Sequence, residues 1–306
     1  MSALIDQLRT LAEPSLPGSG KTADRHEHLL GIARANLSLA RLAEAHFDAL
    51  AILAEAGRAP IVGATYGVWA SEIPGQAITI LNGRLCGKKR FCTGAGMLDR
   101  ALVTVTDPEP KLIDIDLKAN EQTIGVDCRS WITAAFSDTA TATVTFDSTI
   151  VTDGDYVGPS RWYLDRPGFW PGAIGPAACW AGGAIGLVDW ALAQKRNDAH
   201  TLAHLGALQA DAWNLQSVLS NAGREVDEHP NDSKRNRQLA LIVRHLVENT
   251  CADILTRLGR AYGPHPLAFD LEISRRYAEV ELYMRQSHAE RDLESLGSLL
   301  HDSAAS

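Results

Sequence analysis

The segment 85–95, LCGKKRFCTGA, brings two cysteines, three basic side chains and a threonine together within eleven residues. Thiolates bind metal ions, lysines bind phosphates, and hydroxyl groups hydrogen-bond to organic cofactors. Cys86 and Cys92 are six residues apart, no second pair of cysteines completes four ligands, and the chain has no HExxH motif. We therefore expect no metal site here, and the segment could be a phosphate cradle or one wall of a cofactor site.

The segment 17–22, PGSGKT, matches the end of a nucleotide-binding loop, whose backbone amides and lysine hold phosphates. The full motif needs a glycine five residues before Gly20, where this chain has Ser15. It also needs a preceding buried strand, where this chain has the helix-like IDQLRTLAE. We therefore predict a linker here, without a nucleotide site.

Charged side chains gather near the C-terminus, at Arg285, His288, Glu290, Arg291 and Asp292. His288 and Asp292 are one helical turn apart, so these two can pair. Such a cluster is either a solvated, salt-bridged helix face or one side of a cleft.

The joint at 158–172, GPSRWYLDRPGFWPG, places Asp165 among four aromatic residues. Aromatic side chains offer large apolar faces with polar tips. The joint is therefore either interdomain packing or the wall of a pocket for a flat ring.

The elements that position these groups fall into three regions. From about residue 21 to 57 apolar residues recur at helical spacing, and from about 60 to 157 short β-branched stretches alternate with Pro, Gly, Asn and Asp. After the joint, four long amphipathic segments follow one another. We predict an α+β multidomain fold: a short N-terminal helical segment at 1–58, a small β-barrel middle domain at 59–158 and a C-terminal four-helix bundle at 159–306.

Composition narrows the expected partners. A formal charge of −8 without a Lys/Arg stripe argues against nucleic acids and anionic membranes, so a small-molecule substrate or another protein is expected. The N-terminus shows no signal-peptide core, and no run of roughly 18 apolar residues occurs, so we expect a cytoplasmic protein without a membrane span. The five cysteines are odd in number and scattered, which favours reduced thiols.

The segment 85–95 also resembles the L-x-G-x-K-x-(F/W)-x-T signature in the middle β domain of acyl-CoA dehydrogenases. Leu85, Gly87, Lys89, Phe91 and Thr93 carry the match. The order of helix, barrel and bundle is the same as well. Three further stretches are similar to elements of that family: TFDSTIVTDGDYVG at 145–158, GGAIGLVDWALAQKR at 182–196 and LGRAYGPHPLAFDLEISRRYAE at 258–279.

The resemblance implies a flavoprotein that binds FAD and assembles as a homodimer or homotetramer. In the family, the signature threonine, here Thr93, and a (T/S)-E pair, here beginning at Ser71, contact the isoalloxazine ring. Phe91 is expected to pack near the ring and Trp69 to stack on it. Arg196 is expected to bind the pyrophosphate of a neighbouring subunit's FAD through paired hydrogen bonds.

The glutamate that serves as catalytic base in the family is missing from both of its positions. Counting from the family's motifs places Arg285 at one position and Pro176 at the other, and neither accepts a proton at neutral pH. The nearest substitutes are His288 and Asp165. Relative to the family, the chain is also truncated at its N-terminus.

Three functions follow. The first is an FAD-dependent oxidoreductase that acts on a non-standard substrate, with hydride transfer to the flavin beside Thr93 and Ser71. The second is a flavin-dependent monooxygenase of the same superfamily, in which no α-proton has to be removed. The third is a non-catalytic subunit of a larger complex. A flavin reductase or an electron-transfer flavoprotein is the expected protein partner of the enzymes.

Overall fold

The computed structural model describes residues 3–72, 75, 77–106 and 108–305. The chain divides into two compact units, Met1–Glu13 with Arg41–Phe169, and Pro14–Ala40 with Trp170–Ser306. We call the first the β unit and the second the helical unit. Residues from the N-terminal region thus contribute to both units, and the boundaries at 58 and 158 stay a prediction about domains.

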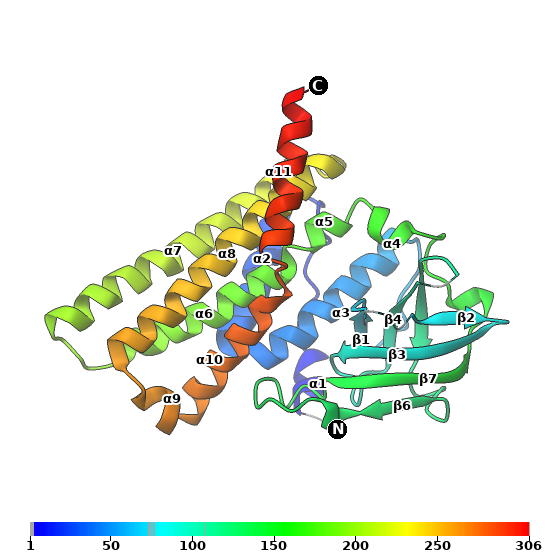
Figure 1. The fold of residues 1–306 in the computed structure, drawn as a ribbon, viewed down its shortest axis with the longest axis horizontal. Coiled ribbons are helices and arrows are strands. Elements are labelled where there is room, and N and C mark those ends of the chain that lie inside the picture. Colours follow the sequence, from blue (N-terminus) through cyan, green and yellow to red (C-terminus); the bar gives the residue numbers. More distant parts are fainter. Residues whose placement is uncertain (1–2, 73–74, 76, 107, 306) are drawn as a thin grey trace. The chain divides into compact units, whose positions relative to one another are not determined.

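The strands of the β unit form two sheets (Figure 1). In the first sheet β4 pairs parallel with β1 and antiparallel with β5, and in the second the order β2-β3-β7-β6 is antiparallel throughout. The strands are β1 (Tyr66–Trp69), β2 (Thr79–Leu81), β3 (Arg84–Cys92), β4 (Arg100–Val105), β5 (Lys111–Asp116), β6 (Ile124–Asp127) and β7 (Ala142–Ile150). The sequence predicts one barrel, whereas the hydrogen bonds of the described strands define two sheets.

The core of the β unit follows from the alternation of its strands. Strand β7 buries Ala142, Val144 and Phe146, every second residue, because successive side chains of a strand point to opposite faces. Helix α3 (Leu37–Glu55) contributes apolar residues to the same unit. One buried cluster joins α3 to β1, β4 and β5: Ala49, Ile52, Leu53, Tyr66, Leu102, Leu112 and Val157.

Short helices complete the β unit. They are α1 (Ala3–Leu8), η1 (Cys128–Ser130), η2 (Asp153–Asp155) and α4 (Trp162–Asp165). Helix α3 begins in the helical unit and continues into the β unit, and α5 (Phe169–Gly172) begins at the last residue of the β unit.

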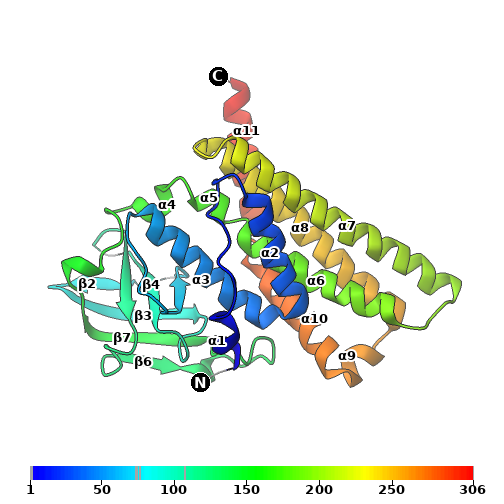
Figure 2. The ribbon, with the colours of Figure 1, turned by 180° about the vertical axis from the view of Figure 1, so that it is seen from behind.

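The helical unit consists of helices in its described part, and the two longest have 30 residues each (Figure 2). Its elements are α2 (Thr22–Ala35), α6 (Gly175–Ala193), α7 (Ala199–Glu228), α8 (Ser233–Tyr262), α9 (His265–Phe269), α10 (Leu271–Tyr283), η3 (Met284–Gln286) and α11 (Glu290–Ala305). Glycine lets α2 pack closely: a Cβ on Gly182 of α6 would lie 2.2 Å from the Leu30 carbonyl oxygen, and one on Gly223 of α7 would lie 2.4 Å from the Ala23 nitrogen. The predicted bundle segments therefore correspond to α6, α7, α8 and α10, with α2 packed among them.

The last predicted helix is interrupted. The sequence pattern predicts one helix over 273–297, but α10 ends at Tyr283, and after η3 the chain leaves helical geometry at Ser287. Ala289 has a φ of 47°, in the left-handed region, before α11 begins at Glu290. The prediction of one continuous helix is wrong here, and His288 lies in the break.

Helix α6 is unusually apolar. The stretch Phe169–Ala193 is long and apolar enough to cross a membrane by length and composition. However, 83% of its apolar 18-residue stretch is buried inside the protein. The core helix of a soluble protein passes the same test, so this stretch is weak evidence for a membrane span.

Candidate functional site

Strand β3 does not alternate strictly to its end. Leu85 and Lys89 are buried, as one face of a strand predicts, but the pairing with β7 shifts between Lys89 and Cys92. Beyond this β-bulge Cys92 is buried and Phe91 is 57% exposed. The period of two in the sequence predicts that Leu85, Lys89 and Phe91 share one face of a strand, but this alternation ends at the bulge, and Cys92 is a core residue.

Phe91 is held in a conformation that costs energy. Its φ of 58° lies in the left-handed region, which strains a bulky residue by about 1–2 kcal/mol. Its ring meets the Trp131 ring edge to face, with centroids 6.1 Å apart. Strained residues cluster at binding and catalytic sites. An exposed aromatic ring on strained backbone is therefore the first feature of the β unit that points to a ligand.

Thr93 connects three other side chains of the β unit. The Trp69 indole nitrogen donates to the Thr93 carbonyl oxygen at 3.1 Å, and Arg41 Nε donates to the Thr93 hydroxyl oxygen at 3.0 Å. A longer contact of 3.4 Å runs from Thr141 Oγ1 to the same hydroxyl. Trp69 and Thr93 thus lie together, and Thr93 is two residues after Phe91 in the chain. Trp69 is buried and supports Thr93 from inside the β unit.

Gly94 fixes the backbone directly after Thr93. Its φ is 75°, and a Cβ there would lie 2.5 Å from a Leu98 methyl carbon. Its amide donates to the Thr139 carbonyl oxygen at 2.9 Å. Only glycine fits this position without rearrangement, and the turn it allows sets the place of Thr93.

Arg41 is a candidate site residue that the sequence predictions omit. It is 7% exposed, and its guanidinium carbon lies 4.5 Å from the Phe136 ring centroid and 5.4 Å from that of Trp131. Cation–π contacts of this kind contribute about 0.5–2 kcal/mol each. The signal in the sequence is a single arginine in SLARLAEA, where the helix is otherwise small or apolar on its buried side.

Lys89 connects the signature strand to the predicted Ser71–Glu72 pair. Its buried ammonium donates to the Ser71 carbonyl oxygen at 3.1 Å, to Glu72 Oε1 at 2.9 Å and to Thr104 Oγ1 at 2.8 Å. Burial lowers the pKa of Lys89, and the bond to Glu72 acts in the opposite direction. The structure therefore anchors Ser71 to β3 and leaves its side chain exposed.

Asp165, one of the two predicted bases, is the last residue of α4, and its side chain is exposed. Within the described part of the β unit, no hydrogen bond joins it to Thr93, Trp69 or Ser71. The structure does not bring it together with the predicted flavin contacts.

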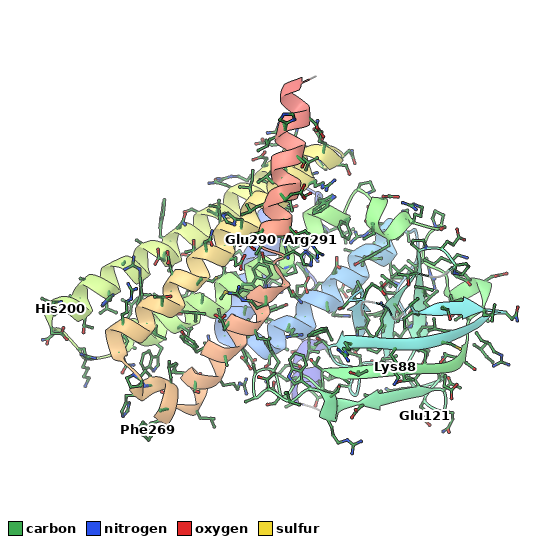
Figure 3. All side chains as sticks on the ribbon, in the orientation of Figure 1. Lys88, Glu121, His200, Phe269, Glu290 and Arg291 are labelled. Carbon is green, nitrogen blue, oxygen red and sulfur yellow. The ribbon has the colours of Figure 1, made fainter. Side chains whose placement is uncertain are left out.

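His288, the other predicted base, pairs with Asp292 in the helical unit. Its Nδ1 lies 3.3 Å from Asp292 Oδ1, and its backbone amide donates to Asp292 Oδ2 at 3.1 Å. A carboxylate accepts hydrogen bonds, so Nδ1 carries the proton and Nε2 is left as the basic nitrogen. The pairing predicted from the spacing is confirmed. Figure 3 labels Glu290 and Arg291, which begin α11 and lie between these two residues in the chain.

Arg285 occupies the position of the family's catalytic glutamate and is itself paired. Its Nη1 lies 3.1 Å from Oε1 of the buried Glu248, and its Nη2 lies 3.5 Å from Glu281 Oε1. Pro176, at the alternative position, lies in the first turn of α6. Neither position therefore offers a free carboxylate.

Arg196, the predicted phosphate ligand, follows α6 in the helical unit. Its Nη1 donates to the Ala261 carbonyl oxygen at 3.0 Å, and its Nη2 lies 3.6 Å from Asp198 Oδ2. The guanidinium side chain stays 52% exposed. These contacts hold Arg196 while leaving part of it open to an anion.

The segment 17–22 binds a carboxylate of the chain itself. The amides of Gly20 and Thr22 donate to Asp227 at 2.9 and 2.8 Å, and the Thr22 hydroxyl donates to Asp227 at 2.6 Å. Asp227, on α7, thus occupies the amides at the start of α2 that a phosphate would need.

A cavity of about 420 Å³ opens on the β unit, and none of the predicted site residues lines it. Its charged lining residues are Arg9, Asp99, Arg100, Asp116 and Lys118. Asp99 pairs with Arg9 and Lys118, and Arg100 pairs with Asp116. Each charged lining residue is therefore ion-paired within the β unit.

The likeness to solved structures shows that this chain has the acyl-CoA dehydrogenase-like fold. FMN-bound TdsC from Paenibacillus sp. A11-2 has a TM-score of 0.79 and 16% identity over 99% of this chain and 88% of that chain. KijD3 in complex with FMN and a dTDP-sugar has a TM-score of 0.78 and 15% identity over 99% and 91%. The methanesulfinate monooxygenase MsuC from Pseudomonas fluorescens has a TM-score of 0.75 and 16% identity over 92% and 83%.

TdsC is a dibenzothiophene monooxygenase. No protein-family model and no curated protein matches the chain. At these identities the likeness establishes the fold, which confirms the resemblance seen in the sequence and the mixture of helices and sheets.

Proposed function

We propose that this chain is a flavin-dependent oxidoreductase and, within that class, a monooxygenase. The end of β3 carries the proposal. There the exposed, strained Phe91 precedes Thr93, and among the residues that the structure describes no hydrogen bond uses the Thr93 hydroxyl proton. A bound flavin supplies two-electron redox chemistry and, in its reduced form, reactivity toward dioxygen.

The residues at the end of β3 fit an isoalloxazine ring. A flat ring needs an apolar face, which Phe91 offers, and hydrogen-bond donors at its edge, which the hydroxyls of Thr93 and Ser71 offer. Trp69 and Arg41 hold Thr93 in place from inside the β unit. These residues bind and orient the ring, and preorganised donors lose little freedom when a ligand arrives.

The monooxygenase assignment within the class is supported by Arg285. Dehydrogenation beside a thioester needs a carboxylate base, whereas Arg285 places a cation, paired with Glu248, at the position where the family has that base. Monooxygenation removes no α-proton. The monooxygenases TdsC and MsuC share the fold, which agrees with this assignment.

His288 is the proposed proton-transfer residue, acting at Nε2 while Asp292 holds Nδ1. The tautomer follows from the bond to the carboxylate. Asp165 stays a second proposal for this role, without an orienting partner among the hydrogen bonds described above.

The flavin and the assembly are proposals as well. The sequence resemblance implies FAD with Arg196 as a phosphate ligand, whereas the TdsC and KijD3 structures contain FMN. We propose a homodimer or homotetramer, since α7 and α8 expose Leu202, Trp213, Ile242 and Leu246, with Trp213 67% exposed. A flavin reductase is the proposed protein partner, and the cytoplasm the proposed location.

The experiment is a titration of the purified protein with FMN and with FAD, each oxidised and anaerobically reduced, followed by flavin fluorescence and absorption. We expect Thr93→Val to weaken binding about three- to tenfold, the value of one hydrogen bond. Thr145→Val, the same change at a half-buried position of β7, is the control and is expected to bind like the wild type. Failure of every flavin form to bind, together with a stable complex with another protein, would establish the non-catalytic subunit instead.

A further inference from the structure

We propose that Arg41 is a positioning residue that fixes the Thr93 hydroxyl as a hydrogen-bond donor toward the ligand. The inference rests on the proposed flavin site and adds the group that controls its central hydroxyl. Arg41 Nε carries a single hydrogen, and that hydrogen points to Thr93 Oγ1 at 3.0 Å.

The hydroxyl protons of this network can be assigned one by one. Thr139 Oγ1 donates to the Phe136 carbonyl oxygen at 2.8 Å, which uses its only proton. Thr141 must therefore donate in its 2.8 Å bond to Thr139, and its 3.4 Å contact with Thr93 is a weaker second branch of the same proton. Thr93 thus accepts from Arg41 and keeps its own proton for another partner.

The surroundings of Arg41 prevent the direction of this bond from reversing. A guanidinium only donates and does not lose its proton in proteins. The group is buried against the rings of Phe136 and Trp131, which hold it where it is. Because Arg41 takes one lone pair of Thr93, the hydroxyl proton is directed away from Arg41.

The atom that meets the Thr93 hydroxyl proton must therefore be an acceptor. The carbonyl oxygens of a flavin and N5 of oxidised flavin accept hydrogen bonds, whereas N3 and the N5 of reduced flavin carry a hydrogen and donate. Arg41 thereby sets which edge of the ring can lie over Thr93, although it is not assigned a contact with the ring.

The test is a double-mutant cycle of Arg41→Met and Thr93→Val, with the affinity for FMN and the shift of the bound flavin's absorption spectrum as readouts. We expect each single variant to weaken FMN binding about three- to tenfold, since one oriented hydrogen bond is lost. We expect the double variant to bind no more weakly than Thr93→Val, with the same spectrum. The proposal would be overturned if the double variant lost affinity by the product of the two single losses, or if Arg41→Met bound FMN normally.

Two further variants keep the result interpretable. Arg41→Leu also removes the donor to Thr93, so it replaces Arg41→Met in the cycle if Arg41→Met does not fold. Arg58→Met removes an arginine whose described partners are Tyr156 and Asp114, and it should leave FMN affinity unchanged. A wild-type protein that binds no flavin would overturn the proposed function itself. If Thr93→Val weakens FMN binding but neither Arg41→Met nor Arg41→Leu does, only the role of Arg41 is overturned.

Discussion

The segments 17–22 and 85–95 are both rich in glycine, lysine and hydroxyl groups, yet the chain uses them in opposite ways. In the first, the amides of Gly20 and Thr22 and the Thr22 hydroxyl all donate to Asp227. In the second, the Thr93 hydroxyl accepts from Arg41, and its proton takes part in no hydrogen bond among the described residues. One segment is satisfied by the chain itself, and the other keeps capacity for a ligand.

This difference shows that donors and acceptors alone do not define a site. A phosphate at 17–22 would have to displace a carboxylate that already makes three hydrogen bonds, at a cost close to the gain from binding. A ligand that accepts the Thr93 hydroxyl proton displaces no acceptor among the described residues. Backbone strain follows the same division, because Phe91 has a positive φ while the positive φ values at 17–22 fall on Gly18 and Gly20, which adopt them readily.

Removal of Asp227 should have the largest effect on this comparison. Asp227→Ala leaves the buried Thr22 and its amide without their acceptor, and we expect the free energy of unfolding to fall by about 3 kcal/mol. Urea unfolding followed by circular dichroism measures this change. Lys21→Ala is the control: its exposed side chain should change stability by less than about 0.5 kcal/mol, and a larger loss would show that the lysine has a role of its own.

Acid should lower the free energy of unfolding through His26, which lies on α2 just after segment 17–22. Burial lowers the pKa of His26 to about 4, from 6.5 in the unfolded chain. Between these values the unfolded chain binds a proton that the folded chain does not, so stability falls as the pH decreases from 6.5 to 4. The expected loss is about 2–3 kcal/mol.

Two variants separate this contribution from the rest of the acid response. His26→Asn keeps a donor toward the Leu219 carbonyl oxygen and should remove the part of the pH dependence that His26 causes. Burial also lowers the pKa of His46, in the β unit, to about 4. His26→Asn should therefore keep the part of the pH dependence that His46 causes and lose a part of similar size. Unfolding at a series of pH values measures both slopes, and an unchanged slope in His26→Asn would contradict the assignment.

The features that sequence reasoning predicted are those set by local spacing or by a long motif. His288 and Asp292 pair because i and i+4 positions adjoin, and this holds even though the chain between them starts a new helix. The link from Lys89 to Ser71 and Glu72 was not predicted, although it runs between two motifs that the resemblance had already selected.

The features that it missed depend on contacts distant in sequence. The exposure of Phe91 results from a bulge, and a bulge is defined only by pairing with β7 more than fifty residues later. Arg41 meets Thr93 across a similar separation, so only its occurrence in an apolar helix hinted at it. The helix break at 287–289 carries neither proline nor glycine, so the periodic pattern continued through it.

The smallest expected change in stability is the sharpest test of whether segment 85–95 is the one that keeps capacity for a ligand. At ordinary strand positions glycine is about 0.5–1 kcal/mol less stabilising than alanine, but a left-handed residue other than glycine is strained by about 1–2 kcal/mol. Phe91→Gly should therefore be more stable than Phe91→Ala by about 0.5–1 kcal/mol, while both lose the ring and bind flavin equally weakly. At Arg90, where φ is not positive, the usual order should hold, so Arg90→Gly should be less stable than Arg90→Ala. Parallel urea titrations of the four variants measure these differences, and the usual order at position 91 would show that Phe91 stores no strain for binding.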